Sequence, residues 1–217
     1  MSIHPAAAQG FAREADSYRR GRPDYPPALD AWLGRAIGLG PGRHVLDLGA
    51  GTGKFTGRLL AGGARVTALE PVPEMRAQFI AVHPGVPVVD GAADAIPLPD
   101  ATLDAVVCAQ SFHWFATAAA LAEIRRVLVP GGRLGLIWNH RDETVGWVRA
   151  LGAIIAPWRG DAPESARGDW RAVFPAPGFF RTGRNQVPPR APGAGGTGDR
   201  RADDVGQLYR PVAGGPP

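Results

Sequence analysis

The most constraining feature of this sequence is a glycine loop that directly follows a short apolar segment. Residues 44–48 are mostly apolar, Asp47 lies near their end, and glycines follow at positions 49, 51 and 53. Glycine tolerates positive φ angles and lets backbone N–H groups approach a ligand closely, but it weakens a turn that binds nothing. In an open α/β sheet, ligands bind beyond the carboxyl ends of the strands. We therefore expect a ligand site at residues 47–53.

Short apolar runs alternate with helical patterns along most of the chain. The predicted strands cover residues 44–48, 65–69, 86–89, 103–109 and 134–138, and the predicted helices cover 28–37, 54–60, 74–82, 118–128 and 143–156. Strands that alternate with helices favour parallel pairing through crossover connections. The sequence thus predicts an α/β fold: a doubly wound, mostly parallel sheet with helices on both faces.

Two familiar nucleotide-binding patterns fail at the glycine loop. A phosphate-binding loop requires G-x-x-x-x-G-K-[ST], but Leu48 occupies its first glycine position and Phe55 follows Lys54. A dinucleotide fingerprint requires G-x-G-x-x-G, and its third glycine position falls on Lys54 or Thr56, depending on the register. The pattern that remains is D-x-G-x-G-x-G after a strand. A glycine-rich turn without a ligand is the alternative.

A second carboxylate ends the next predicted strand. Glu70 lies 23 residues after Asp47 and directly precedes Pro71. An acidic residue about 20 residues beyond a glycine loop is placed to accept hydrogen bonds from both ribose hydroxyls of a nucleoside. The alternative is a solvated strand end.

With these motifs, the chain resembles the class I S-adenosylmethionine (SAM)-dependent methyltransferases, in particular small-molecule enzymes that include trans-aconitate methyltransferase-like proteins. The resemblance covers about residues 11–156. Beyond the glycine loop and Glu70, it rests on residues 91–100, 103–107, 110–115, 123–128 and 130–132. It implies a Rossmann-like methyltransferase fold and SAM as the cofactor.

The resemblance also implies a set of cofactor-binding residues, which are Asp47, Gly49, Ala50, Gly51, Gly53, Glu70, Pro71, Met75, Asp94, Ala95, Gln110, Tyr18 and Arg22. Asp94 and Ala95 are expected to hold the adenine, with the carboxylate facing the exocyclic amine; Asp94 can also bond its own turn. Tyr18 and Arg22 belong to a segment that resembles an arm folding over the cofactor. Both are candidates to contact the methionine carboxylate or an acidic acceptor, since a guanidinium binds a carboxylate through two hydrogen bonds. The alternative is a surface arm.

His113 is the candidate catalytic residue, because an imidazole titrates near neutral pH and can act as a general base. The competing interpretation, which we favour, makes it a wall residue beside Trp114, because methyl transfer to a carboxylate requires no base. No metal site is expected. The histidines, which are His4, His44, His83, His113 and His140, show no ligand spacing with one another or with Cys108.

The composition of the chain limits which classes of binding partner are expected. The net charge of +4 comes mostly from arginines in residues 181–217, Lys54 is the only lysine, and no basic cluster is interleaved with aromatic residues, so nucleic acid is not expected. The longest apolar runs are too short to span a bilayer, and residues 1–10 do not resemble a signal peptide. Cys108, the only cysteine, fits a reducing cytoplasm. The sequence does not fix the oligomeric state.

The predicted activity is methyl transfer from SAM to a small-molecule acceptor, with a carboxylate oxygen as the expected nucleophile. Methyl transfer from a sulfonium depends mainly on positioning, which fits a chain without a catalytic triad. Two alternatives remain open. One is a SAM-binding remnant that is catalytically impaired or truncated, and the other is a nucleotide-dependent oxidoreductase.

The C-terminal part departs from the family pattern. We divide the chain into an arm and helix over the cofactor site (residues 1–40), a SAM-binding core (41–180) and a tail (181–217). Proline, glycine and arginine dominate the tail, a composition that buries little apolar surface. We expect the tail to be disordered and non-native, the product of a shifted reading frame, and the closing strands of the sheet to be missing.

Overall fold

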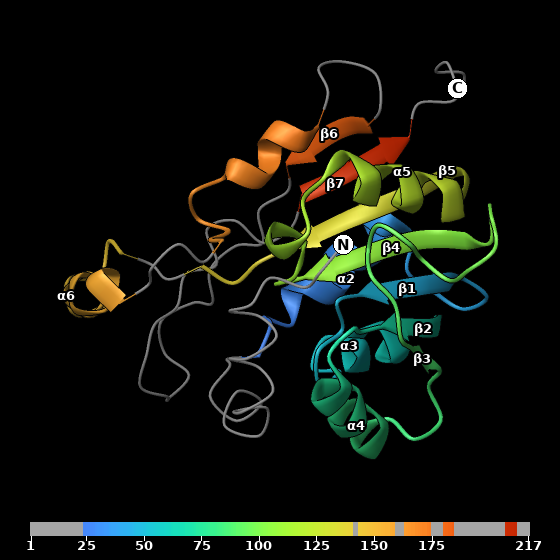
Figure 1. Ribbon diagram of the computed structural model, residues 1–217, viewed down its shortest axis with the longest axis horizontal. Helices are drawn as coiled ribbons and strands as arrows, with labels where there is room; N and C mark the ends of the chain where they lie inside the picture. The colour runs from blue at the N-terminus through green and yellow to red at the C-terminus, as the bar shows by residue number, and fades with distance from the viewer. Residues whose placement is uncertain (1–23, 141–142, 159–162, 175–179, 185–206, 212–217) are drawn as a thin grey trace.

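The computed structural model describes residues 24–140, 143–158, 163–174, 180–184 and 207–211. Its centre is a seven-stranded sheet in the order β3-β2-β1-β4-β5-β7-β6 (Figure 1). Neighbouring strands from β3 to β5 all pair in parallel. The strands are β1 (His44–Leu48), β2 (Arg65–Leu69), β3 (Val88–Val89), β4 (Leu103–Ala109), β5 (Leu128–Ile137), β6 (Phe180–Arg184) and β7 (Gln207–Pro211). The predicted doubly wound architecture is confirmed.

Five α-helices and three short 3-10 helices accompany these strands in the described residues. They are α2 (Ala28–Ile37), α3 (Thr56–Ala61), α4 (Pro73–Val82), η1 (Phe112–Trp114), α5 (Ala118–Val127), α6 (Gly146–Ile155), η2 (Ala156–Trp158) and η3 (Asp169–Val173). Local chemistry sets several ends. Gly38 ends α2 in the left-handed conformation, Pro73 opens α4, and the Thr117 side chain accepts the Ala120 N–H at the start of α5.

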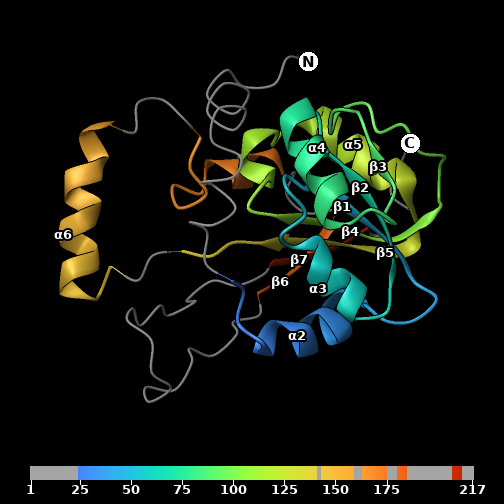
Figure 2. The same ribbon diagram turned by 90° about the horizontal axis from the view of Figure 1, so that it is seen from below.

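The sheet separates two apolar clusters. On one face, α2 and α3 bury Leu33 and Leu59 against β1 and β2. On the other, α5 buries Leu121 and Ile124 against β4 and β5, together with Trp170 from η3. Figure 2 shows the sheet between α2 and α5, with α6 lying to one side. Residues 24–40 therefore contain a core helix, while residues 1–23 of the predicted arm lie outside the described residues.

The prediction that the closing strands are missing is wrong. The backbone of Gln207–Pro211 pairs antiparallel with β5, and Phe180–Arg184 pairs antiparallel with β7. Without a neighbour, the edge of β5 would leave backbone N–H and C=O groups unpaired, and an extended segment can pair with them. The average composition of the 37-residue tail does not reveal a strand of only five residues within it. Residues 185–206 and 212–217 lie outside the described residues, so their predicted disorder stays a prediction. The consequence expected of a shifted reading frame, a sheet without its closing strands, is not observed, and the shifted frame itself stays a prediction.

Element bounds differ from prediction mainly at β5, which begins at Leu128 rather than at residue 134. Its register against β4 shifts between Leu103 and Ala105, so that residues 130–132 form an irregularity inside the strand rather than a turn before it. Among the described residues, no helix has the length and apolar character required to cross a membrane.

Candidate functional site

The glycine loop joins β1 to α3 at the carboxyl edge of the sheet. Gly49, Gly51 and Gly53 all have positive φ angles, of 73°, 58° and 81°. The loop is tied to β2, since the N–H groups of Gly49 and Ala50 both donate to the Leu69 carbonyl, at 2.8 and 3.1 Å. A left-handed backbone at alternate positions turns successive N–H groups toward one side, which suits a polar ligand.

The surroundings of the three glycines differ. A Cβ on Gly49 would lie 2.7 Å from Ser111 Cβ, and a Cβ on Gly53 would lie 2.6 Å from His83 Cδ2 and 2.8 Å from Phe79 Cδ2. A Cβ on Gly51 would meet no described protein atom within 4 Å. Protein packing therefore explains the outer two glycines. At Gly51 the described residues leave that side of the backbone open, so the φ angle and not packing accounts for glycine there.

Asp47 is almost completely buried beneath this loop. Its Oδ2 accepts a hydrogen bond from the Thr56 hydroxyl at 2.6 Å, whereas Oδ1 is buried with no hydrogen-bond partner among the described residues. Burial raises the pKa of Asp47 to about 7; the nearby Glu70 carboxylate raises it further and the Thr56 hydrogen bond opposes the shift. A buried acceptor without a donor is costly in a folded protein and points to a missing donor.

Glu70 approaches the same loop from the end of β2 and is also buried. Oε2 accepts the Gly51 N–H at 2.8 Å and Oε1 accepts the Val72 N–H at 2.9 Å. Burial raises the pKa of Glu70, and these two backbone hydrogen bonds act against that rise. A carboxylate oxygen has two lone pairs, so each oxygen can accept one further donor. The structure thus brings the two predicted carboxylates to one edge of the sheet, with Gly51 bonded to the second.

The segment after β4 packs directly against the glycine loop. Ser111 Oγ donates to the Leu48 carbonyl at 2.7 Å, and the Ser111 side chain lies over Gly49. Gln110 has a φ of 61°, a strained value for a residue with a side chain, and its N–H donates to the Ile137 carbonyl at 2.8 Å. Strained backbone persists where its surroundings hold it and gathers at functional sites. Ser111, the residue after Gln110, thus contacts the glycine loop, whereas the hydrogen bonds of Gln110 go to Ile137 and Asn139.

His113 follows on η1, within an aromatic cluster. Trp138 Nε1 lies 3.2 Å from His113 Nδ1, and the Trp138 ring stacks on Trp170 at 4.4 Å between centroids. Because an indole nitrogen only donates, Nδ1 must be the acceptor, and a neutral His113 then carries its proton on Nε2. The contributions of Trp138 and Trp170 were not predicted. Trp138 ends a predicted strand, which was a usable signal, whereas Trp170 comes from a distant segment without a motif.

The predicted adenine residues lie in a tight turn between β3 and β4. Ala95 N–H donates to the Ala92 carbonyl at 3.1 Å. The side chains of Ala93 and Ile96 are buried, while Asp94 is half-buried and Ala95 is exposed. Buried side chains on either side thus anchor the turn, and Ala95 is its exposed residue.

The remaining predicted residues are spread more widely. Met75 is buried on α4, and Pro71 is half-buried directly after Glu70. Tyr18 and Arg22 lie outside the described residues. The described chain begins beside the glycine loop, because Asp24 forms an ion pair with Lys54 at 3.3 Å. No group of three or more potential ligand side chains within the described ranges could hold a metal ion.

Comparison with known proteins agrees with this geometry. Residues 46–136 match a family described as "Methyltransferase domain". An uncharacterised methyltransferase of Mycobacterium tuberculosis is 51% identical over 177 residues, which cover 82% of this chain and 68% of that protein. The chain belongs to the SAM-dependent methyltransferase family. Malonyl-[acyl-carrier protein] O-methyltransferase of Serratia marcescens is 38% identical over 136 residues, 58% of this methyltransferase and 50% of its relative.

Solved structures agree at the level of the fold. A SAM-dependent methyltransferase from Aquifex aeolicus superposes with a TM-score of 0.58 and 22% identity, covering 93% of this methyltransferase and 98% of that chain. This likeness shows the fold. SAM is the cofactor because the chain belongs to the SAM-dependent methyltransferase family, as the mycobacterial relative shows, and the nucleotide-dependent oxidoreductase alternative is set aside.

Proposed function

We propose that this methyltransferase binds SAM at the carboxyl edge of β1 and β2 and transfers its methyl group to a carboxylate oxygen of a small acid or acyl group. The observation that carries the cofactor assignment is the open face of Gly51, with the unpartnered Oδ1 of Asp47 beneath the loop and Glu70 bonded to Gly51 itself.

The residues fit the chemistry of SAM group by group. The α-ammonium of the methionine part is the donor that Asp47 lacks, and a cation beside the carboxyl would favour its ionised form. The ribose hydroxyls can donate to Glu70, which retains acceptor capacity on both oxygens. Asp94 and Ala95 are proposed to receive the adenine, and Gly49, Ala50, Gly53, Pro71, Met75 and Gln110 to shape the site around them. Tyr18 and Arg22 keep their proposed role in an arm over the cofactor.

The acceptor is proposed to lie against the aromatic cluster at η1. Because Nδ1 of His113 accepts from Trp138, a neutral His113 carries its proton on Nε2 and is a hydrogen-bond donor there, which is the polarity that an anionic oxygen requires. A carboxylate is already deprotonated at neutral pH and needs no general base. The Serratia relative is named as an O-methyltransferase of a malonyl group, which carries a free carboxylate. The trans-aconitate-like subtype is consistent with the same acceptor chemistry.

The transfer requires positioning more than acid–base chemistry. Bound SAM supplies a methyl carbon on a sulfonium; when the acceptor oxygen bonds to that carbon, the sulfur keeps the electron pair of the broken bond. The glycine loop and Glu70 fix the cofactor end, His113 holds the acceptor oxygen, and Phe112, Trp138 and Trp170 exclude water. No proton moves in the step.

A direct test incubates the full chain with methyl-labelled SAM and a panel of acceptors, followed by base-labile methyl-ester detection. The panel contains trans-aconitate, other small dicarboxylates, a malonyl thioester, and matched amines and alcohols. We expect ester label with at least one acid and none with its amide. Label that appears only on amines or alcohols would contradict the carboxylate assignment, and SAM binding without turnover on any acceptor would favour the impaired remnant.

A further inference from the structure

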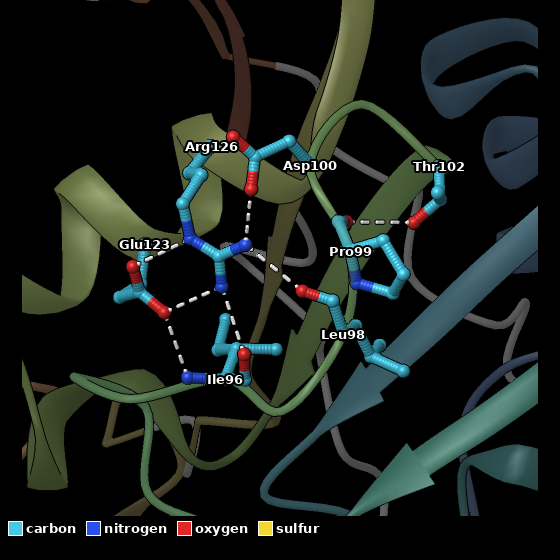
Figure 3. Close-up of polar contacts among 7 residues, drawn as sticks. All are labelled: Ile96, Leu98, Pro99, Asp100, Thr102, Glu123 and Arg126. Atoms are coloured by element: carbon cyan, nitrogen blue, oxygen red, sulfur yellow. Dashed lines mark hydrogen bonds and ion pairs between the residues drawn. The ribbon is translucent and has the colours of Figure 1, made fainter.

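An arginine on α5 makes an unusually complete set of contacts with the loop that carries Asp94 and Ala95. Arg126 makes five hydrogen bonds, to Glu123 Oε1 and Oε2, to the Ile96 and Leu98 carbonyls, and to Asp100 Oδ1, at 2.6–2.9 Å (Figure 3). A guanidinium has five N–H donors in a fixed planar fork. Every donor of Arg126 is therefore used, and a lysine could not replace it, because an ammonium has three donors and no fork.

Glu123, one helical turn before Arg126, completes the arrangement. Its Oε2 accepts the Ile96 N–H at 2.8 Å while both of its oxygens accept from Arg126. The pKa of Glu123 is lowered, first by the hydrogen bond from Arg126. The two side chains thus satisfy both the N–H and the carbonyl of Ile96, the residue that directly follows Ala95. Figure 3 shows the Arg126 guanidinium between Glu123 and the loop.

The far end of the loop is held by the backbone of the same helix end. The N–H groups of Ala101 and Thr102 donate to the Arg126 and Val127 carbonyls, both at 2.9 Å. Ala101 has a φ of 50°, a strained value for a residue with a side chain. Strain of this kind persists only where neighbouring contacts impose it. The end of α5 therefore determines the backbone path of residues 96–102.

From these contacts we propose that Arg126 and Glu123 are positioning residues for the cofactor's adenine. They fix the peptide groups of Ile96 and thereby orient the turn at Asp94 and Ala95. This inference rests on the proposed function, which assigns the adenine to that turn. When the Arg126–Glu123 pair fixes the turn, the Asp94 carboxylate is held at a defined angle to the bound base. The pair should therefore control the preference for adenine over other bases as well as the affinity for the cofactor.

The test measures binding of two product analogues by calorimetry to full-length wild-type, Arg126→Lys and Glu123→Gln chains. S-adenosylhomocysteine carries the exocyclic amine that Asp94 would accept. S-inosylhomocysteine carries an oxygen there, which would face the carboxylate with a like partial charge. For the wild type we expect a preference for the adenosine compound of about 10- to 100-fold, the range for a hydrogen bond to a charged group. The preference should fall to within about threefold in Arg126→Lys, and less far in Glu123→Gln.

Controls separate positioning from folding. Arg43→Lys changes another arginine ion pair, 2.7 Å from Asp104, and should keep the wild-type preference. Thermal melting identifies any variant that fails to fold, and the isosteric Glu123→Gln provides the milder second case. Equal loss of affinity for both analogues, with the preference intact, would overturn the proposal. A wild-type chain that binds neither analogue would instead contradict the proposed function itself.

Discussion

The two halves of the proposed site are built from different materials. The half at β1 and β2 consists of backbone groups and two buried carboxylates, Asp47 and Glu70, held by hydrogen bonds of 2.6–2.9 Å. The half at η1 consists mainly of aromatic rings, and its polar contacts include those from Trp138 to His113 at 3.2 Å and from Trp170 to the Ser165 carbonyl at 3.0 Å. The first half has to form hydrogen bonds and ion pairs with specific groups of a charged cofactor that carries hydroxyls. The second half is proposed mostly to exclude water from the acceptor. Substitutions should therefore be severe in the first half and graded in the second.

The largest effects are expected at the glycines. Gly53→Ala should destabilise the fold by about 3 kcal/mol, because its Cβ would overlap His83 and Phe79 at a positive φ. Gly51→Ala meets no such overlap and should cost about 1 kcal/mol in stability, yet weaken SAM binding at least about 100-fold. Denaturant unfolding and calorimetry give the two quantities. If both variants lost stability equally and Gly51→Ala kept its affinity, the open face of Gly51 would not be the cofactor face.

Glu70→Ala should be next in size. It removes a charged acceptor for two ribose hydroxyls and should cost about 1.5–3 kcal/mol in SAM affinity. Since Glu70 also accepts the Gly51 and Val72 N–H groups, the alanine variant should melt at a lower temperature. Glu70→Gln is the matched control, with similar shape and no charge. An unchanged SAM affinity in a folded Glu70→Ala chain would refute the ribose assignment.

The pH dependence of SAM affinity should be smaller. Burial raises the pKa of Asp47 to about 7, so between about pH 4 and 7 the folded protein holds a proton that the unfolded chain has released. The contribution of Asp47 to the free energy of unfolding is therefore largest at low pH and is lost as the pH rises to the folded-state pKa of about 7. SAM needs the carboxylate, so its affinity should increase about tenfold from pH 6 to pH 8. Asp47→Asn, which removes this carboxyl, should remove most of this dependence; an identical slope in both chains would argue against an ammonium partner for Asp47.

The smallest effects are expected in the aromatic half. His113→Gln should lower turnover about threefold, since one hydrogen bond to the acceptor is changed, and should leave the pH–rate profile without a new limb. Trp138→Phe should act through the same contact, so the double variant should be little worse than either single one. A thousandfold loss in His113→Gln with the acidic limb abolished would make His113 the general base instead.

The sequence predicted the arrangement of elements around Asp47 and Glu70 well because the signals for it are local. A strand, a glycine loop and an acidic residue at the end of the next strand are consecutive features, and β1, β2 and α2 have the predicted bounds. The close packing of His83 against Gly53, which leaves no room for a Cβ, could not be predicted in this way, because it depends on contacts between separate elements. The same applies to Arg126, whose partners lie up to 30 residues away in the chain.

The two closing strands were missed for a related reason. The composition of the tail argued against structure, but a strand requires only a short extended segment and a partner with free backbone groups, which β5 provides to Gln207–Pro211. Trp170, which stacks on Trp138, was missed because nothing in its local sequence marks it for that contact. Contacts between distant segments, rather than local patterns, account for what the sequence did not reveal.

The most direct test of the account is a calorimetric titration of the wild-type full chain with SAM and, separately, with NAD. The glycine loop and the two buried carboxylates predict saturable binding of SAM at one site per chain and no binding of NAD, because the third glycine of the dinucleotide fingerprint is absent. Saturable NAD binding without SAM binding, in a chain shown to be folded by thermal melting, would contradict the assignment of this edge of the sheet to SAM.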